Sequence, residues 1–191
     1  MRALILNGSR KTDKAFDNIV NILVHSLKKF DYEVDCIILH ETEISDCDGC
    51  FNCWIKTPGI CIIDDVGRDI AIRHIQSDML ILLTPITFGG YSSELKKAID
   101  RLIPNELPFY TKIDEEIHHE PRYEQYPSLI GIGVLPSPDE ESERIFKKLV
   151  SRNTINLHSP THSEGIVYLN DSVEGLEEKV GAILGKVGFG R

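Results

Sequence analysis

Four of the chain's five cysteines lie close together, in the pattern Cys47-x2-Cys50-x2-Cys53-x7-Cys61. Thiolates at this spacing can reach the irons of a cubane cluster, and the same ligands can bind zinc tetrahedrally. A loop of metal-free thiols is the third interpretation. We therefore expect metal or redox chemistry in this loop, and a [4Fe-4S] cluster is the leading hypothesis.

A basic turn near the N-terminus has the composition of a phosphate site. It joins a predicted strand to a predicted helix, where free N–H groups and the helix dipole favour an anion. It contains neither a Walker motif nor Gly-x-Gly-x-x-Gly, so a phosphate monoester fits better than a pyrophosphate. The alternative is a basic surface turn. Hydroxyl donors and cations make up the candidate ligands, which are Ser9, Arg10, Lys11, Thr12 and Lys14.

The segment Thr84-Pro85-Ile86-Thr87-Phe88-Gly89-Gly90-Tyr91 follows another predicted strand. Proline stiffens this segment, and its glycines let the backbone approach a ligand closely. Backbone N–H and C=O groups here can bond the polar edge of a flat ring, while Phe88 and Tyr91 line its face. The alternative is a turn whose aromatic side chains pack inward.

Several other polar residues are assigned structural roles. Asp64 and Asp65 are expected to begin a helix, and Asp100 and Arg101 to form a structural ion pair. Structural roles are also assigned to one histidine on a helix face, to four histidines without metal-ligand spacing and to one cysteine on a predicted buried strand. In that order, these residues are His74, then His118, His119, His158 and His162, and finally Cys36.

The elements that position these residues are five apolar runs of strand length that alternate with helical patterns. The runs cover 3–6, 34–39, 79–83, 129–134 and 166–169, and the helical patterns cover 16–30, 66–76, 92–102, 137–150 and 171–187. This order predicts a parallel sheet with helices on both faces. Ser137 is the expected N-cap of the fourth helix and Asp171 that of the last. Residues 104–127 are expected to form a long connection without regular structure.

Length and composition set further limits. The 191 residues suit one domain, 1–191, with a cysteine-rich loop at 45–65 and an insertion at 104–127. The net charge of −9 argues against nucleic-acid binding. We expect no signal peptide and no membrane span, and therefore a cytoplasmic protein whose clustered cysteines are not disulfides.

Taken together, these segments resemble the NADPH-dependent FMN reductase branch of the flavodoxin superfamily, particularly the iron–sulfur flavoproteins. The matching pieces are Leu-Asn-Gly-Ser-Arg at 6–10, the cysteine motif, Asp64-Asp65, Thr-Pro-Ile-Thr-Phe-Gly at 84–89 and Ser-x-x-Leu-Lys-x-x-x-Asp-Arg at 92–101. The resemblance covers residues 1 to 103. Where family members often carry Gly-Asn-Thr, this chain has Lys14-Ala15-Phe16, so Lys11 or Lys14 is expected to substitute.

The resemblance implies a flavodoxin-like three-layer α/β sandwich whose five-stranded parallel sheet has the order 2-1-3-4-5. It implies non-covalent FMN, with its phosphate on Ser9, Arg10 and the following backbone, and its ring on Pro85, Ile86, Thr87, Phe88 and Gly89. The cysteines would then exchange electrons with the flavin. It also implies a homodimer or homotetramer.

Three functional hypotheses follow, of which the third is a metal-bound or thiol-based regulatory module without flavin. The first is an FMN-dependent oxidoreductase that takes electrons from NAD(P)H or a ferredoxin-like donor and passes them to a small-molecule or protein acceptor, such as a quinone or a flavin. No general acid or base is evident, because the flavin itself carries the chemistry. The second is a non-catalytic electron carrier of the flavodoxin type. Negligible NAD(P)H oxidation without a partner reductase would identify the carrier.

Overall fold

The structure is a computed structural model that describes residues 1–11, 13 and 15–187. Two of the predicted phosphate ligands, Thr12 and Lys14, lie outside the described residues. No helix in the described part of the chain is both long enough and apolar enough to cross a membrane.

The central sheet contains five parallel strands and has the predicted order. Its strands run in the order β2 (Glu33–Ile38), β1 (Arg2–Asn7), β3 (Met79–Pro85), β6 (Ser128–Leu135) and β7 (His162–Tyr168). Strand β3 is buried along almost its whole length, as its uninterrupted apolar run predicts. Because β2 and β3 lie on opposite sides of β1, the strand order reverses between β1 and β3. Ligands of open parallel sheets bind beyond the strand ends at such a point.

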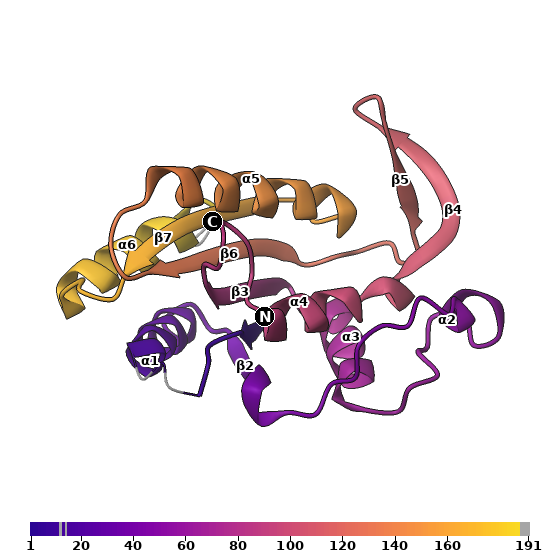
Figure 1. Cartoon of the computed structure of the whole chain (residues 1–191), viewed down its shortest axis with the longest axis horizontal. Helices are drawn as coiled ribbons and strands as arrows, with labels where there is room; N and C mark the ends of the chain where they lie inside the picture. The colour runs from indigo at the N-terminus through magenta and orange to yellow at the C-terminus, as the bar shows by residue number, and fades with distance from the viewer. Residues whose placement is uncertain (12, 14, 188–191) are drawn as a thin grey trace.

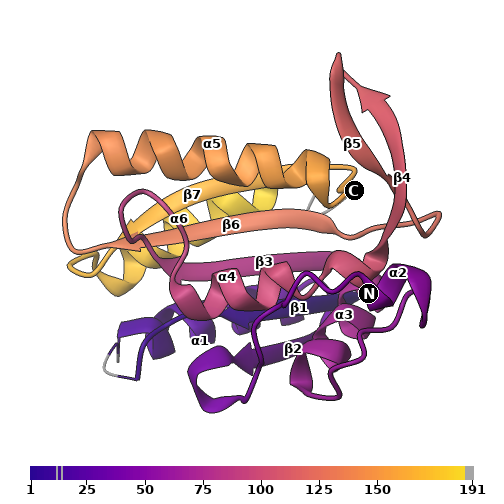
Figure 2. The ribbon, with the colours of Figure 1, turned by 45° about the vertical axis from the view of Figure 1, so that its right-hand side comes forward.

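Helices cover both faces of this sheet (Figures 1 and 2). The first face carries α1 (Ala15–Lys28) and α6 (Val173–Gly185), and the second carries α3 (Val66–Gln76), α4 (Ser93–Asp100) and α5 (Glu140–Asn156). Alternate residues of each strand serve the two cores: Ile5 packs with α1, while Leu6 packs with α4.

Both helix starts in the second half of the chain lie later than predicted. The N-cap of α5 is Asp139, whose carboxylate accepts from the Ser142 amide (3.2 Å), and not Ser137. The N-cap of α6 is Ser172, whose hydroxyl accepts from the Gly175 amide (3.1 Å), and not Asp171. In both cases a side-chain oxygen three residues before an unpaired amide fixes the start.

Residues 104–127 are not structureless, which corrects the prediction. They form a short 3₁₀ turn η2 (Ile103–Asn105) and an antiparallel hairpin of β4 (Glu106–Ile113) and β5 (Glu116–Pro121) that projects from the body (Figure 1). Asp114 and Glu115 make its turn at φ values of 46° and 67°. The turn lacks the Asn-Gly or Gly-rich pair that is typical of a short hairpin, so no local pattern predicts it.

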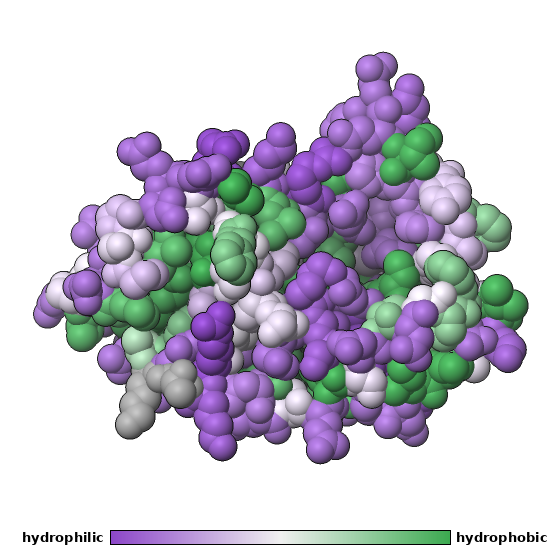
Figure 3. Space-filling model, viewed as in Figure 1, coloured by the Kyte–Doolittle hydropathy of each residue, from purple (hydrophilic) through white to green (hydrophobic). Residues whose placement is uncertain are grey.

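The stretch 40–65 is a loop for most of its length, as predicted. It also contains a short 3₁₀ helix η1 (Leu39–Glu41) and one turn of helix, α2 (Asn52–Ile55), which carries Cys53 and Trp54. Hydrophobic side chains gather around α2 on the surface shown at the right of Figure 3, and they include Phe51, Ile55 and Ile60.

Candidate functional site

The loops that follow β1 and β3 meet at the switch point of the sheet. Nη2 of Arg10, in the first loop, donates to Oγ1 of Thr87 in the second, at 3.4 Å. The amide of Gly8 donates to the carbonyl of Leu83 (2.8 Å), which ties the first loop to the end of β3. Two segments that are far apart in the sequence therefore form one surface.

The first loop is held in place from several sides. The carbonyl of Gly8 accepts from the Ser92 hydroxyl (2.7 Å), and the carbonyl of Ser9 accepts from Nδ1 of His40 (3.0 Å). A Cβ on Gly8 would lie 2.7 Å from Cβ of Leu95, so only glycine allows this approach of α4. Ser9 is buried, Arg10 and Lys11 are exposed, and all three are predicted phosphate ligands.

Asp13 is a residue of this loop that the sequence analysis missed. Its Oδ2 accepts from the amide of Arg10 at 2.9 Å, and its carbonyl accepts from the amide of Phe16 at 3.0 Å. The carboxylate therefore already accepts from the Arg10 amide, which is one of the backbone donors that a bound phosphate would use. The signal was available, since an aspartate beside a helix start commonly binds backbone amides.

The second loop is a tight turn from Thr87 to Gly90, closed by reciprocal amide–carbonyl bonds of 3.0 and 2.9 Å. Phe88 and Gly89 have φ values of 50° and 76°. A Cβ on Gly89 would lie 2.7 Å from Cγ2 of Ile145, so glycine is required there. Phe88, in contrast, is fully exposed (101%) in a conformation that disfavours its side chain.

The amides of Phe88 and Gly89 donate no backbone hydrogen bond within the described residues. This turn therefore presents two backbone N–H groups that have no backbone acceptor within the described part of the chain. Tyr91 lies differently from Phe88: its hydroxyl accepts from Nδ2 of Asn153 (3.0 Å), and its ring meets Phe146 edge-on. Burial raises the pKa of this phenol.

The four clustered cysteines line one small cavity of about 40 Å³. Cys47 and Cys50 are exposed, Cys61 is half-buried and Cys53 is buried, and burial, followed by the neighbouring thiols, raises the pKa of Cys53. Within the described residues, no three Cys, His, Asp or Glu side chains stand in the arrangement of metal ligands. The thiols converge, but their positions are not those of a closed metal site.

A buried ion pair supports the base of the cysteine loop. Arg101 pairs with Asp65, the N-cap of α3, with Nη2 and Oδ1 2.8 Å apart. Asp100 pairs separately with Lys96 on the surface of α4, so the two neighbouring residues belong to different ion pairs. Nε of Arg68 donates to the carbonyl of Cys61 (3.1 Å). The predicted role of Asp65 at a helix start is confirmed, whereas the predicted ion pair between Asp100 and Arg101 is wrong, because the two residues pair with Lys96 and Asp65 instead.

A row of four rings connects the cysteine loop to the projecting hairpin. Phe51 stacks on Trp54 (5.2 Å between centroids), Trp54 lies against His119 (4.8 Å), and His119 lies against Tyr110 (4.8 Å). Nε1 of Trp54 also donates to the carbonyl of Glu106 at 2.9 Å. The hairpin is therefore anchored on the segment that carries Cys50 and Cys53.

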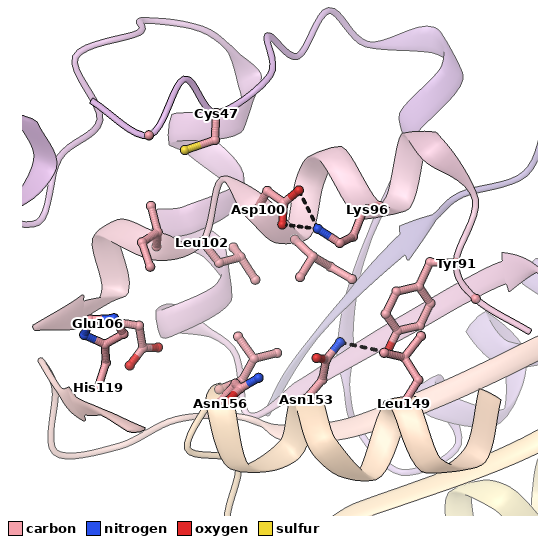
Figure 4. Close-up of a pocket in the computed structure, with 15 residues that line it drawn as sticks. Cys47, Tyr91, Lys96, Asp100, Leu102, Glu106, His119, Leu149, Asn153 and Asn156 are labelled. Atoms are coloured by element: carbon pink, nitrogen blue, oxygen red, sulfur yellow. Dashed lines mark hydrogen bonds and ion pairs between the residues drawn. The ribbon is translucent and has the colours of Figure 1, made fainter. Parts of the chain in front are cut away.

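A larger cavity of about 840 Å³ lies between α4, α5 and the hairpin. Figure 4 shows Tyr91 at one end and Cys47 near the other, with Leu149 and Asn153 of α5 along one wall. The cavity thus extends from the second loop to the cysteine loop. Its volume and its mixture of apolar and polar walls suit a small organic molecule.

The other singled-out residues lie in the core or beside carboxylates. His74 is completely buried, and burial lowers its pKa to about 4. Burial, followed by the charge of Asp35, raises the pKa of Cys36 to about 11, which fits an inert thiol. His158 lies 2.9 Å from the buried carboxylate of Glu106. His118 and His162 likewise lie beside Glu116 and Glu164.

A family model and several curated proteins match more than half of this chain. The family model of NADPH-dependent FMN reductases matches residues 1–114. An iron-sulfur flavoprotein of Methanocaldococcus jannaschii is 32% identical over 110 residues, which are 57% of this chain and 55% of that protein. An FMN-dependent NADPH-azoreductase of Staphylococcus aureus is 30% identical over 102 residues, 53% of this chain and 52% of that protein. The chain spans about half the length of the curated relatives it matches.

Solved structures match over nearly the whole chain. An azoreductase has a TM-score of 0.67 at 11% identity and covers 97% of this chain and 96% of its own. An NAD(P)H:quinone oxidoreductase from Methanothermobacter marburgensis has a TM-score of 0.62 at 13% identity and covers 96% and 95%. An FMN-dependent NADH-azoreductase from Bacillus anthracis, solved with FMN, has a TM-score of 0.62 at 13% identity and covers 95% of both chains. At these identities the likeness confirms the fold, which is flavodoxin-like.

Proposed function

Because this chain belongs to the NADPH-dependent FMN reductase family, we propose that it is an FMN-dependent oxidoreductase that passes electrons from NAD(P)H to an organic or protein acceptor. The observation that carries the proposal is the meeting of the two loops through Arg10 and Thr87. One loop offers a buried hydroxyl and two cations, and the other offers two unpartnered amides. A phosphate attached to a flat ring system needs such a pair of neighbouring sites.

The residues present fit FMN. Ser9, Arg10 and Lys11 would hold the phosphate, with Thr12 and Lys14 predicted as further ligands. The amides of Phe88 and Gly89 would hydrogen-bond the polar edge of the ring, and the exposed Phe88 ring would cover part of its face. Pro85, Ile86 and Thr87 complete the predicted ring site. FMN supplies hydride and single-electron transfer when it is bound; the protein binds, orients and shields it.

The cavity between α4 and α5 is the proposed place of the acceptor. It contacts the second loop at Gly90 and Tyr91 and the cysteine loop at Cys47 and Gly49. An acceptor bound there would lie between the two segments that we assign to electron transfer. Its aliphatic walls would exclude water, while Asn153 and Asn156 would orient polar groups of the acceptor.

We further propose that Cys47, Cys50, Cys53 and Cys61 hold a [4Fe-4S] cluster. Two observations support this: the soft thiol donors lie around a common cavity, and the Nε–H of Arg101, which also lines that cavity, has no acceptor among the described residues. A volume of about 40 Å³ holds one or two waters, so loading requires the exposed half of the loop, with Cys47 and Cys50, to move outward. Relatives named iron-sulfur flavoproteins favour a cluster over zinc.

We also propose a homodimer or homotetramer. The exposed Phe88 and the apolar side chains around α2 are the features that a second subunit would cover. Size-exclusion chromatography with light scattering measures the assembly, and a monomer at micromolar concentration would contradict this part of the proposal.

Anaerobic purification of the full chain, with a visible spectrum and flavin analysis, tests the main proposal. We expect one FMN per chain and NAD(P)H oxidation that depends on added acceptor. Arg10→Met should lose FMN, whereas the matched Arg144→Met, on the exposed surface of α5, should keep it. Native protein that neither contains nor takes up FMN would overturn the assignment. FMN content with negligible turnover would identify the carrier alternative.

A further inference from the structure

Arg101 lies directly after α4 and is almost completely buried, with 1% of its surface exposed. A buried guanidinium is unfavourable unless its N–H groups find acceptors. Nη1 donates to the carbonyl of Ser45 (2.8 Å) and to Oδ2 of Asp65 (2.9 Å). Nη2 donates to the carbonyl of Ile63 (3.3 Å) and to Oδ1 of Asp65 (2.8 Å).

These acceptors lie at the two ends of the cysteine loop. Ser45 precedes Cys47, and Ile63 follows Cys61, so one side chain fixes the distance between the ends of the segment that carries all four thiols. Burial alone would raise the pKa of Asp65, but the bonds from Arg101 and from the Ser45 amide outweigh it and lower the pKa to about 2. The carboxylate therefore stays charged, and the clamp stays closed, at neutral pH.

The fifth N–H of Arg101 is unused. Its Nε is buried and has no hydrogen-bond partner among the described residues. Arg101 also lines the cavity that the four thiols line, and it carries the only positive charge among that cavity's lining residues, all of which are described. A purely structural clamp would leave this buried donor unsatisfied, which is unfavourable.

Cys61 lines the same cavity as Arg101, and it lies two residues before Ile63, whose carbonyl accepts from Nη2 of Arg101. The free Nε–H and the Cys61 sulfur therefore belong to the same small region, although Nε makes no hydrogen bond to a described residue. A sulfur that carried more negative charge, as a metal-bound thiolate does, would be a better acceptor.

We propose that Arg101 is a positioning residue of the cysteine loop, which holds the loop ready for metal and donates its Nε–H to a cysteine sulfur of the loaded site. The inference rests on the cluster proposed above. A cationic N–H donor beside the sulfurs stabilises the more negative, reduced state and thereby raises the reduction potential. Lysine lacks the forked guanidinium and the separate Nε–H of arginine, so it cannot both clamp the loop and reach the sulfur.

Three variants separate this role from a general effect on folding. Arg101→Lys keeps the charge but removes Nε–H and the fork. The double variant Arg101→Met with Asp65→Asn removes both charges together, so that no unpaired charge stays buried. Lys96→Met is the matched control, because it lies on α4 and does not line the cysteine cavity. Each full-length protein is assayed for FMN, for Cd²⁺ affinity of the reduced apoprotein, and for iron, sulfide and cluster potential after anaerobic reconstitution.

We expect all three variants to retain FMN. Cd²⁺ affinity and iron content should fall by about tenfold or more in both Arg101 variants and stay unchanged in Lys96→Met. Any cluster left in the Arg101 variants should have a more negative potential. Unchanged Cd²⁺ affinity and potential in folded Arg101→Lys would overturn the inference. Wild-type protein without FMN would instead overturn the proposed function, and the Cd²⁺ comparison would still decide the role of Arg101.

Discussion

Asp13 places a negative charge in the loop that we assign to the FMN phosphate. Its Oδ2 accepts from the Arg10 amide, so phosphate must displace it and must also approach a like charge. We expect Asp13→Asn to lower the dissociation constant for FMN by about tenfold, equal to about 1.4 kcal/mol. Fluorescence titration of the apoprotein measures this. Asp17→Asn, an exposed neighbour on α1, is the control and should change little; weaker binding by Asp13→Asn would contradict the assignment.

Phe88 combines full exposure with a left-handed backbone, which points to a role outside the folded core. Glycine relieves the backbone, so Phe88→Gly should raise the free energy of unfolding of the apoprotein by about 1 kcal/mol. The same change removes the proposed ring contact and should weaken FMN binding by up to about tenfold. Denaturant melts and FMN titration measure the two effects.

Phe88→Ala separates the two consequences. It removes the ring but keeps a side chain in the left-handed conformation, so FMN binding should weaken while stability stays near that of the wild type. If both variants bound FMN as the wild type does, Phe88 would have no part in the ring site.

At the scale of elements, α3 carries a buried titratable group. The pKa of His74 is lowered by burial to about 4, while the unfolded chain binds a proton near pH 6.5. The stability that neutral His74 contributes is therefore complete above pH 6.5 and is lost as the pH falls toward 4. We expect the wild type to lose roughly 3 kcal/mol more over this window than His74→Leu. Urea unfolding at several pH values measures it; parallel curves for the two proteins would refute it.

The elements also show what the sequence can and cannot specify. The sheet was predictable because buried strands such as β3 are uninterrupted apolar runs that alternate with amphipathic helices. The β4–β5 hairpin was not, because it contains Pro108 and several charged residues and turns at Asp114 and Glu115. The two candidate loops were identified from their positions after β1 and β3, although FMN binding to them stays a prediction.

Contacts between segments that are far apart in the chain could not be predicted from local sequence patterns. Nothing near Arg101 indicates that its guanidinium reaches Ser45, because 56 positions separate them. The ring row from Phe51 to Tyr110 likewise joins the cysteine loop to an element that the sequence did not reveal. Such contacts depend on the final packing of α4 and the hairpin, which no window of the sequence encodes.

At the scale of the whole molecule, the cavity between α4, α5 and the hairpin has a volume of about 840 Å³. Leu149→Trp would fill part of it next to Tyr91, at the end of the second loop. We expect FMN content to be retained, while KM for a quinone such as menadione rises several-fold. Lys148→Trp adds the same ring at an exposed neighbouring position and should leave KM unchanged. Equal KM values in both variants would place the acceptor elsewhere.

Trp54 is the only tryptophan in the chain, and it stands between Cys53 and the hairpin with its indole N–H on the carbonyl of Glu106. Its emission spectrum is consequently a built-in optical probe of this region. Metal uptake that shifted the exposed half of the loop would alter the stacking of Phe51 on the indole and thus its quantum yield. The arm formed by β4 and β5 would register the same event, since its His119 lies against that indole.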